Sequence, residues 1–194
     1  MQERPIQKKI IKITWYEAST VLHITNLRHI ESLRKGFKHR HGYKPTIGED
    51  IQDNFYGAMG ELAFAKATDT YFPMSVNTFK EADVGINWQV RTVGSHRNRD
   101  LLIRPNDPTK HKYVLVEITN DPSDANMLLG LGTATQYIAI IHGWIEGVVG
   151  KKPEYLTHMG HPDRPKVYRI AQDALRCPSW IPIRRPERSY FESS

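Results

Sequence analysis

The chain has 194 residues and a formal net charge of +6, a size that suits one domain with a substantial hydrophobic core. Its one cysteine, Cys177, excludes an internal disulfide and a cysteine-rich zinc site. No run of about 18 apolar residues predicts a membrane-spanning helix. The first residues also lack the pattern of a signal peptide, so we expect a cytoplasmic protein without membrane contact.

Charge is distributed unevenly along the chain. Residues 1–50 carry ten Lys/Arg and five Asp/Glu, residues 51–150 carry eight and eleven, and residues 151–194 carry nine and five. An acidic centre between basic flanks is expected of a metal site whose flanks bind phosphates. A generally basic surface would give the same distribution, so charge alone leaves both interpretations open.

Residues 6–33 predict a short strand and then a helix. The stretch KKIIKITW suits an edge strand or the lead-in to a helix, and apolar residues recur at helical spacing over 16–33. Gly36 is expected to end this helix, after which the chain is basic and irregular. The basic loop predicts either contacts to nucleic-acid phosphates or a solvated surface. Its candidate phosphate-binding residues are Lys35, Lys38, Arg40 and Lys44.

Two glycines mark the interior of the next predicted helix, which spans residues 51–68. In a helix, Gly57 and Gly60 each cost about 1 kcal/mol relative to alanine. We therefore expect the backbone of this helix to lie close to a strand, a phosphate or a metal site. Glu61, next to Gly60, either belongs to such a site or faces water.

Asp50 or Asp53 is expected to cap that helix, and strands dominate the chain after it. The strands are expected at residues 81–84, 88–93, 101–104, 113–118 and 135–141. The links GSHRNRD and PNDPTKHK, which follow the second and third of these strands, carry turn residues typical of hairpin loops. This part of the chain supplies three more candidate phosphate-binding residues, Arg97, Arg99 and Arg104.

No internal repeat or low-complexity linker divides the chain. We therefore predict one α/β domain over residues 1–194, with a mixed central β-sheet flanked by helices. A basic helical region covers about residues 1–50, and a loop-rich C-terminal extension covers about residues 150–194. Within that extension, residues 168–175 predict a short strand and a helical turn.

The stretch DVGINWQVRT, residues 83–92, contains an acid, a predicted tight turn and an alternating strand. Side chains alternate along a strand, so Gln89 and Arg91 point to one side and Val90 to the other. Two carboxylates, Glu61 and Asp83, can hold Mg²⁺, which prefers oxygen ligands. Gln89 offers a neutral third oxygen, and Arg91 could bind a phosphate or the charge that develops during attack on it.

This order of residues resembles the PD-(D/E)XK, or restriction-endonuclease-like, nuclease superfamily. There a helix glutamate precedes an acid on one strand and an acid-x-lysine on the next. Here GAMGE supplies Glu61, ADVG supplies Asp83, and QVR stands at the acid-x-lysine place. The motifs GELAFAK, DVG, QVRT, LLIRPND, YVLV and GWIEG, in this order, are also similar to those of a family of bacteriophage-encoded proteins placed in that superfamily.

The resemblance implies a restriction-endonuclease-like core and a nuclease that uses Mg²⁺ or Mn²⁺ to hydrolyse DNA in the host cytoplasm. Glu61, Asp83 and Gln89 would bind the metal, and Arg91 would complete the catalytic set. Two departures weaken that expectation. Gln89 replaces an acid and removes one negative charge from the metal site. Arg91 replaces the lysine, and arginine cannot act as a base because it stays protonated.

Two other functions remain open at this point. A nuclease fold with a degenerate site could bind nucleic acid without cutting it, which the residues at Gln89 and Arg91 favour. A phage structural or host-interaction protein could reuse the fold, because one fold hosts many functions. A homodimer would suit double-strand cutting.

Overall fold

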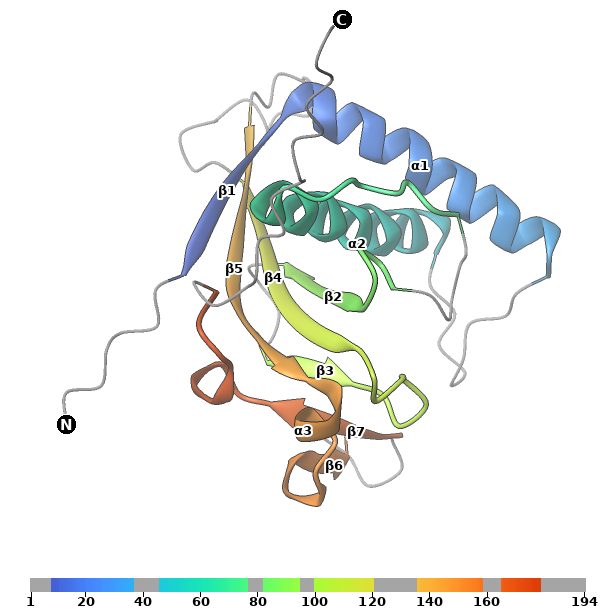
Figure 1. Ribbon diagram of the computed structural model, residues 1–194. Coiled ribbons are helices and arrows are strands. Elements are labelled where there is room, and N and C mark those ends of the chain that lie inside the picture. The colour runs from blue at the N-terminus through green and yellow to red at the C-terminus, as the bar shows by residue number, and fades with distance from the viewer. Residues whose placement is uncertain are drawn as a thin grey trace, which may run out of the picture.

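The computed structural model describes residues 8–36, 46–76, 82–94, 100–120, 136–158 and 165–178. Two long helices, a four-stranded sheet and a three-stranded sheet form three layers (Figure 1). The helices and strands are β1 Lys9–Thr14, α1 Trp15–Arg34, α2 Ile47–Thr68, β2 Trp88–Gly94, β3 Leu101–Ile103, β4 Lys112–Asn120, β5 Gln136–Glu146, α3 Gly147–Gly150, β6 Leu156–His158 and β7 Lys166–Ile170. Two 3₁₀ turns are η3 Pro153–Tyr155 and η4 Gln172–Ala174.

The first strand and helix form as predicted. β1 is an edge strand that pairs with β5, and α1 follows it directly. A capping box starts α1, because Thr14 accepts a hydrogen bond from the Glu17 N–H and the Glu17 carboxylate accepts one from the Thr14 N–H. Gly36 follows the C-cap with a φ of +63°, a backbone conformation that glycine adopts without strain. The prediction that Gly36 ends this helix is confirmed.

α2 begins earlier than the sequence pattern predicted. Thr46 caps it, and Glu49 completes a second capping box, so the helix starts at Ile47. The prediction that Asp50 or Asp53 caps this helix is wrong, since both lie inside it. The apolar pattern hid the true start because the first turn of α2 is exposed and carries only one apolar residue, Ile47.

The larger sheet has the strand order β1-β5-β4-β2 and is mixed. β1 and β4 both pair antiparallel with β5, whereas β2 and β4 pair parallel. The smaller sheet, β3-β7-β6, is antiparallel. The predicted mixed α/β class is confirmed, with two sheets in place of one.

Two details of the strand prediction are corrected. β2 and β4 are parallel, so the chain between them cannot form the expected hairpins, and β3 pairs with β7 in the other sheet. The strand predicted at residues 81–84 is reduced to one bridge between Val84 and Trp88 within the described residues. Gly85, with a φ of +62°, turns the chain back before a longer strand can form.

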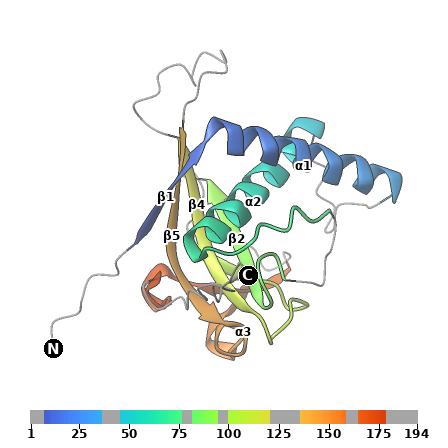
Figure 2. The same ribbon diagram turned by 45° about the horizontal axis from the view of Figure 1, so that its top comes forward.

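Each face of the larger sheet packs against its own hydrophobic core. One core joins the two helices to Trp88, Val90 and Val114. The other joins Tyr113 and Leu115 to the smaller sheet. Alternation along β2 and β4 therefore separates a helix-facing side from a side that faces β3 and β7. Figure 2 shows α1 and α2 crossing over the same face of the larger sheet.

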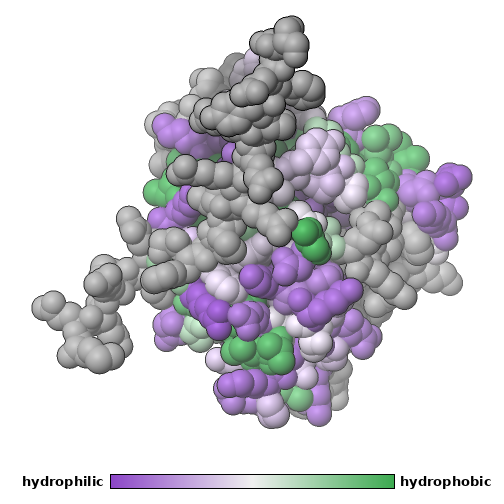
Figure 3. Space-filling model, viewed as in Figure 1, coloured by the Kyte–Doolittle hydropathy of each residue, from purple (hydrophilic) through white to green (hydrophobic). Residues whose placement is uncertain are grey.

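α1 buries only part of its apolar surface. Val21 and Ile24 face the core, as the helical spacing predicted. Other apolar residues of the same helix are exposed, and part of this surface is visible over α1 in Figure 3. They include Leu22, Leu27, Ile30 and Leu33. None of the helices in the described ranges is both long enough and apolar enough to cross a bilayer.

The close approach predicted from the helix glycines is confirmed at one of them. A Cβ added to Gly60 would overlap the hydroxyl of Thr92 on β2, whereas one added to Gly57 would meet no atom within 4 Å. α2 therefore lies directly on β2 at Gly60, which fixes the neighbouring Glu61 relative to that strand.

We predict that Gly60→Ala lowers the free energy of unfolding by about 1–3 kcal/mol, because the added methyl group overpacks the contact with Thr92. The matched change Gly57→Ala should raise stability by about 0.5–1 kcal/mol, because it improves helix propensity in open space. Urea unfolding of both variants measures the difference. Equal effects of the two substitutions would contradict the packing of α2 on β2.

Candidate active site

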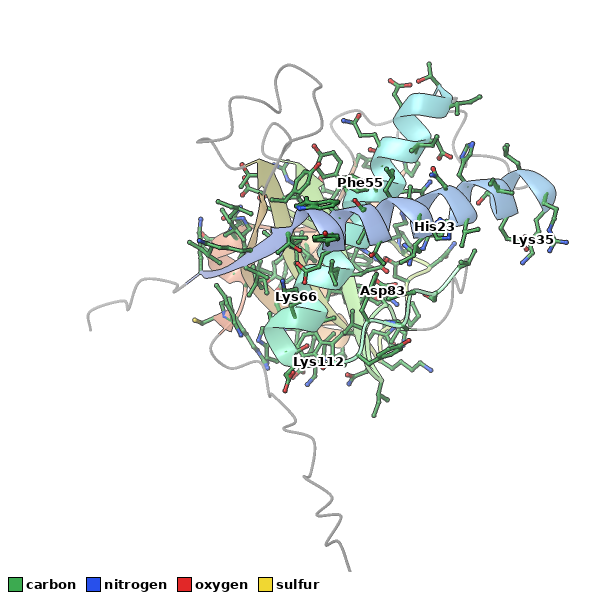
Figure 4. All side chains as sticks on the ribbon, turned by 90° about the horizontal axis from the view of Figure 1, so that it is seen from above. His23, Lys35, Phe55, Lys66, Asp83 and Lys112 are labelled. Carbon is green, nitrogen blue, oxygen red and sulfur yellow. The ribbon has the colours of Figure 1, made fainter. Side chains whose placement is uncertain are left out.

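Asp83 lies in a tight turn at the edge of the larger sheet. Its N–H donates to the Trp88 carbonyl at 2.8 Å, and its carboxylate accepts a hydrogen bond from the Val90 N–H at 2.7 Å. β2 is an edge strand of the larger sheet. The Asp83 carboxylate therefore takes the Val90 N–H, a donor on the open edge of the sheet that a further strand could otherwise bond. The turn therefore fixes Asp83 beside the first residues of β2. Figure 4 labels Asp83 to one side of α1 and α2 when the molecule is seen from above.

Glu61 is held by an arginine of the other long helix. Arg28 of α1 donates to both carboxylate oxygens of Glu61, at 3.0 and 2.7 Å, and its Nε donates to the Ser75 carbonyl at 2.8 Å. The side chains of Arg28 and Glu61 are each only 12% exposed. This bidentate pair ties α1 to α2 and neutralises a carboxylate that has little contact with water.

The two carboxylates interact electrostatically. Burial raises the pKa of Glu61; Arg28 opposes that rise, and the charge of Asp83 adds to it. Burial also raises the pKa of Asp83, against the lowering effects of the Val90 N–H and of the nearby charges, which include Arg91 and Arg28. Two acids with raised pKa values in one partly buried place are typical of functional sites.

Gln89 and Arg91 point to the side of β2 that faces the smaller sheet. The Arg91 guanidinium pairs with Asp107 at 2.7 Å, lies 5.3 Å from the centre of the Tyr113 ring, and donates to the Gln89 side-chain oxygen at 3.3 Å. Arg91 therefore pairs with neither Glu61 nor Asp83, although its charge acts on Asp83. Asp107 also accepts from the Arg104 N–H at 2.9 Å, which fixes the turn that carries it.

His111 precedes β4 and interacts electrostatically with Asp83. It is 3% exposed, and its Nδ1 has no hydrogen-bond partner among the described residues. Burial lowers the pKa of His111, Lys110 and Arg91 lower it further, and Asp83 raises it. The imidazole is therefore neutral near pH 7.

The carboxylate pair suits a divalent cation, but the present arrangement is not a complete metal site. Glu61 and Asp83 supply the hard oxygen atoms that Mg²⁺ and Mn²⁺ prefer. Within the described ranges, no three His, Cys, Asp or Glu side chains gather as metal ligands. Both oxygens of Glu61 already accept hydrogen bonds from Arg28. The two carboxylates therefore supply part of a donor set for an ion, and Arg28 is their counter-charge in this structure.

Two of the predicted phosphate-binding residues lie in the described part of the chain. Lys35 pairs with Glu31 at 3.0 Å at the end of α1, well apart from Asp83 in Figure 4. Arg104 is exposed on the turn that Asp107 fixes. The others lie outside the described residues and are Lys38, Arg40, Lys44, Arg97 and Arg99.

Sequence reasoning missed Arg28 and His111, which act on the two acids, and Asp107 as the partner of Arg91. Arg28 follows Val21 by seven residues and Ile24 by four, so it falls on the buried side of α1. A charged residue on an apolar stripe signals a buried partner, and this signal was available in the sequence. Asp107 and His111 gave no comparable signal, because their positions depend on how β2, β4 and the turn before β4 meet.

Comparisons with known proteins found no match for this chain among protein-family models, curated proteins or solved structures.

We predict that Asp83→Asn stabilises the protein near neutral pH. The folded state raises the pKa of Asp83, so its contribution to stability is greatest below the ordinary carboxyl pKa and falls as pH rises toward the raised value. Asparagine avoids that loss and can still accept the Val90 N–H. The melting temperatures of the two proteins should converge in acid and separate at pH 7. A variant that is less stable at pH 7 would show that Asp83 acts mainly as a structural anchor.

Proposed function

We propose that the protein is a metal-dependent nuclease that hydrolyses DNA phosphodiester bonds. The observation that carries this proposal is the carboxylate pair of Glu61 and Asp83, whose pKa values are raised by burial. Folding keeps these acids together although their ionised forms are disfavoured there. Such local cost is expected where function, rather than stability, selects the residues.

Glu61 and Asp83 would hold Mg²⁺ or Mn²⁺, and the bound ion would supply an acidified water and charge for attack on a phosphate. Gln89 points with Arg91 to the other side of β2, so its side chain would have to turn toward Asp83 to act as the third oxygen ligand. Arg91 would face the phosphate and stabilise the charge that develops on it. Its guanidinium is already oriented by Asp107 and the Tyr113 ring, so little reorganisation is needed when substrate binds.

The chain order of the site supports a restriction-endonuclease-like core as part of this proposal. A helix glutamate at Glu61 is followed by Asp83 before β2, then by Gln89 and Arg91 within β2. Close packing of Gly60 on Thr92 places the helix beside that strand.

A second function is favoured by the Arg28 contact. Arg28 supplies a positive charge to Glu61 without any metal ion, and Gln89 lacks the charge of an acid. A protein with this arrangement could bind nucleic acid through basic residues and leave it uncut. Such binding would weaken steeply with salt and would not depend on divalent ions.

A cleavage assay with Asp83→Asn separates the two functions. The purified protein should nick or cut DNA with Mg²⁺ or Mn²⁺, and the variant should not, because it lacks a charged metal ligand. The melting temperature of the variant, measured as described above, shows whether any loss of cleavage arises from unfolding. Asp173→Ala, which changes an exposed acid far along the chain, is the control and should cut normally. Metal-independent binding without cleavage by the unmodified protein would favour the second function.

Arg91 gives a further prediction for the nuclease. Arg91→Ala should raise the barrier by about 3 kcal/mol, the usual effect of removing a preorganised charge-stabilising donor. Arg91→Lys should keep substantial activity, because it preserves a positive charge at the place where the superfamily uses lysine. Initial rates and urea unfolding are measured for both variants. Arg169→Ala serves as the control, because Arg169 is 51% exposed and its ion pair with Asp100 lies on the surface. A large stability loss with unchanged cleavage per folded molecule would assign Arg91 to structure alone.

A further inference from the structure

Arg28 occupies the same carboxylate oxygens that a metal ion would need. Its two terminal nitrogens donate to the two oxygens of Glu61, and its charge also acts on Asp83. The contact is only 12% exposed, so solvent screens it weakly. Arg28 is thus the built-in counter-ion of the carboxylate pair.

A divalent ion and the Arg28 guanidinium repel each other when both bind the Glu61 carboxylate. Two positive charges about 4 Å apart repel by about 4 kcal/mol per unit charge product at an effective dielectric constant of 20. The hydrogen bonds to both Glu61 oxygens also restrict direct ligation of an ion by this residue. Arg28 must therefore release Glu61, at least in part, when an ion binds.

A released Arg28 would stay close to the site. Its Nε donates to the Ser75 carbonyl, a contact that does not involve Glu61. Rotation of the terminal guanidinium nitrogens about this anchor frees them while the side chain remains beside the carboxylates. Free guanidinium nitrogens in a fixed fork bind phosphate oxygens in pairs.

We propose that Arg28 exchanges partners, from Glu61 in the metal-free protein to a phosphate of the nucleic acid when a divalent ion occupies the carboxylate pair. The inference rests on the proposed metal site and adds a phosphate-binding residue from α1 to it. Arg28 then serves two states: it neutralises Glu61 without metal, and it holds substrate with metal.

Calorimetric titration with Mn²⁺, without DNA, tests the first half of the exchange. Arg28→Gln should bind Mn²⁺ at least about tenfold more tightly than the unmodified protein, because a competing positive charge has been removed. Arg28→Lys, which keeps the charge but cannot cover both oxygens, should fall between them. Arg34→Gln is the control, because Arg34 pairs with Glu31 on a surface where its side chain is 73% exposed.

Arg28→Gln leaves Glu61 without its counter-ion and could fold poorly in chelator. Thermal unfolding with and without Mn²⁺ covers that case: the gain in melting temperature on adding Mn²⁺ should be larger for Arg28→Gln than for the unmodified protein. Equal affinities and equal gains for the two proteins would overturn the exchange while leaving the proposed metal site intact. Absence of Mn²⁺ binding by every variant would instead reject the metal site, and the exchange with it.

Binding of a short DNA duplex, followed by fluorescence anisotropy, tests the second half. With Ca²⁺ as an ion that supports binding, Arg28→Gln should bind DNA several-fold more weakly than the unmodified protein. In chelator, the two should bind equally, since Arg28 is then engaged with Glu61. A loss of affinity that is the same in both conditions would contradict the exchange, as would no loss in either.

Discussion

One ion pair makes the candidate site possible: Arg28 on Glu61. α1 and α2 bring these side chains together where each is 12% exposed, and the pair lies beside a second carboxylate, Asp83. Without Arg28, folding would leave two acids in a partly buried place, and a buried charge that loses its partner costs about 3–5 kcal/mol. The contact between the two helices depends on this pair, and Arg28 limits how far burial raises the pKa values of both acids.

The position of Asp83 at the edge of the larger sheet connects two sides that the core otherwise separates. Glu61 and Arg28 lie on the side of the helices, whereas Arg91 points toward the smaller sheet and pairs with Asp107. Both arginines act electrostatically on Asp83, because its turn ends at β2 and no further described strand covers it. Charged groups from both sides of the larger sheet therefore act on this one carboxylate.

The sequence allowed prediction of elements with a clear period or a clear end, such as α1, β4 and the stop at Gly36. The cost of Gly57 and Gly60 in a helix also predicted a close neighbour for this backbone, which the structure shows to be β2, at Gly60 only. Strand partners were not predictable, because alternation identifies faces but does not determine which strands pair, and β3 joined the other sheet. The partner of Arg91 was missed for the same reason: Asp107 reaches it through a turn whose position depends on that pairing.

The most direct measurement is X-ray diffraction from crystals soaked in Mn²⁺, with data collected near the manganese absorption edge. We expect an anomalous peak at ligating distance from the Glu61 and Asp83 carboxylates, with Arg28 displaced from at least one Glu61 oxygen. A map without a peak between these carboxylates at saturating Mn²⁺, and with Arg28 still bound to both Glu61 oxygens, would contradict this expectation.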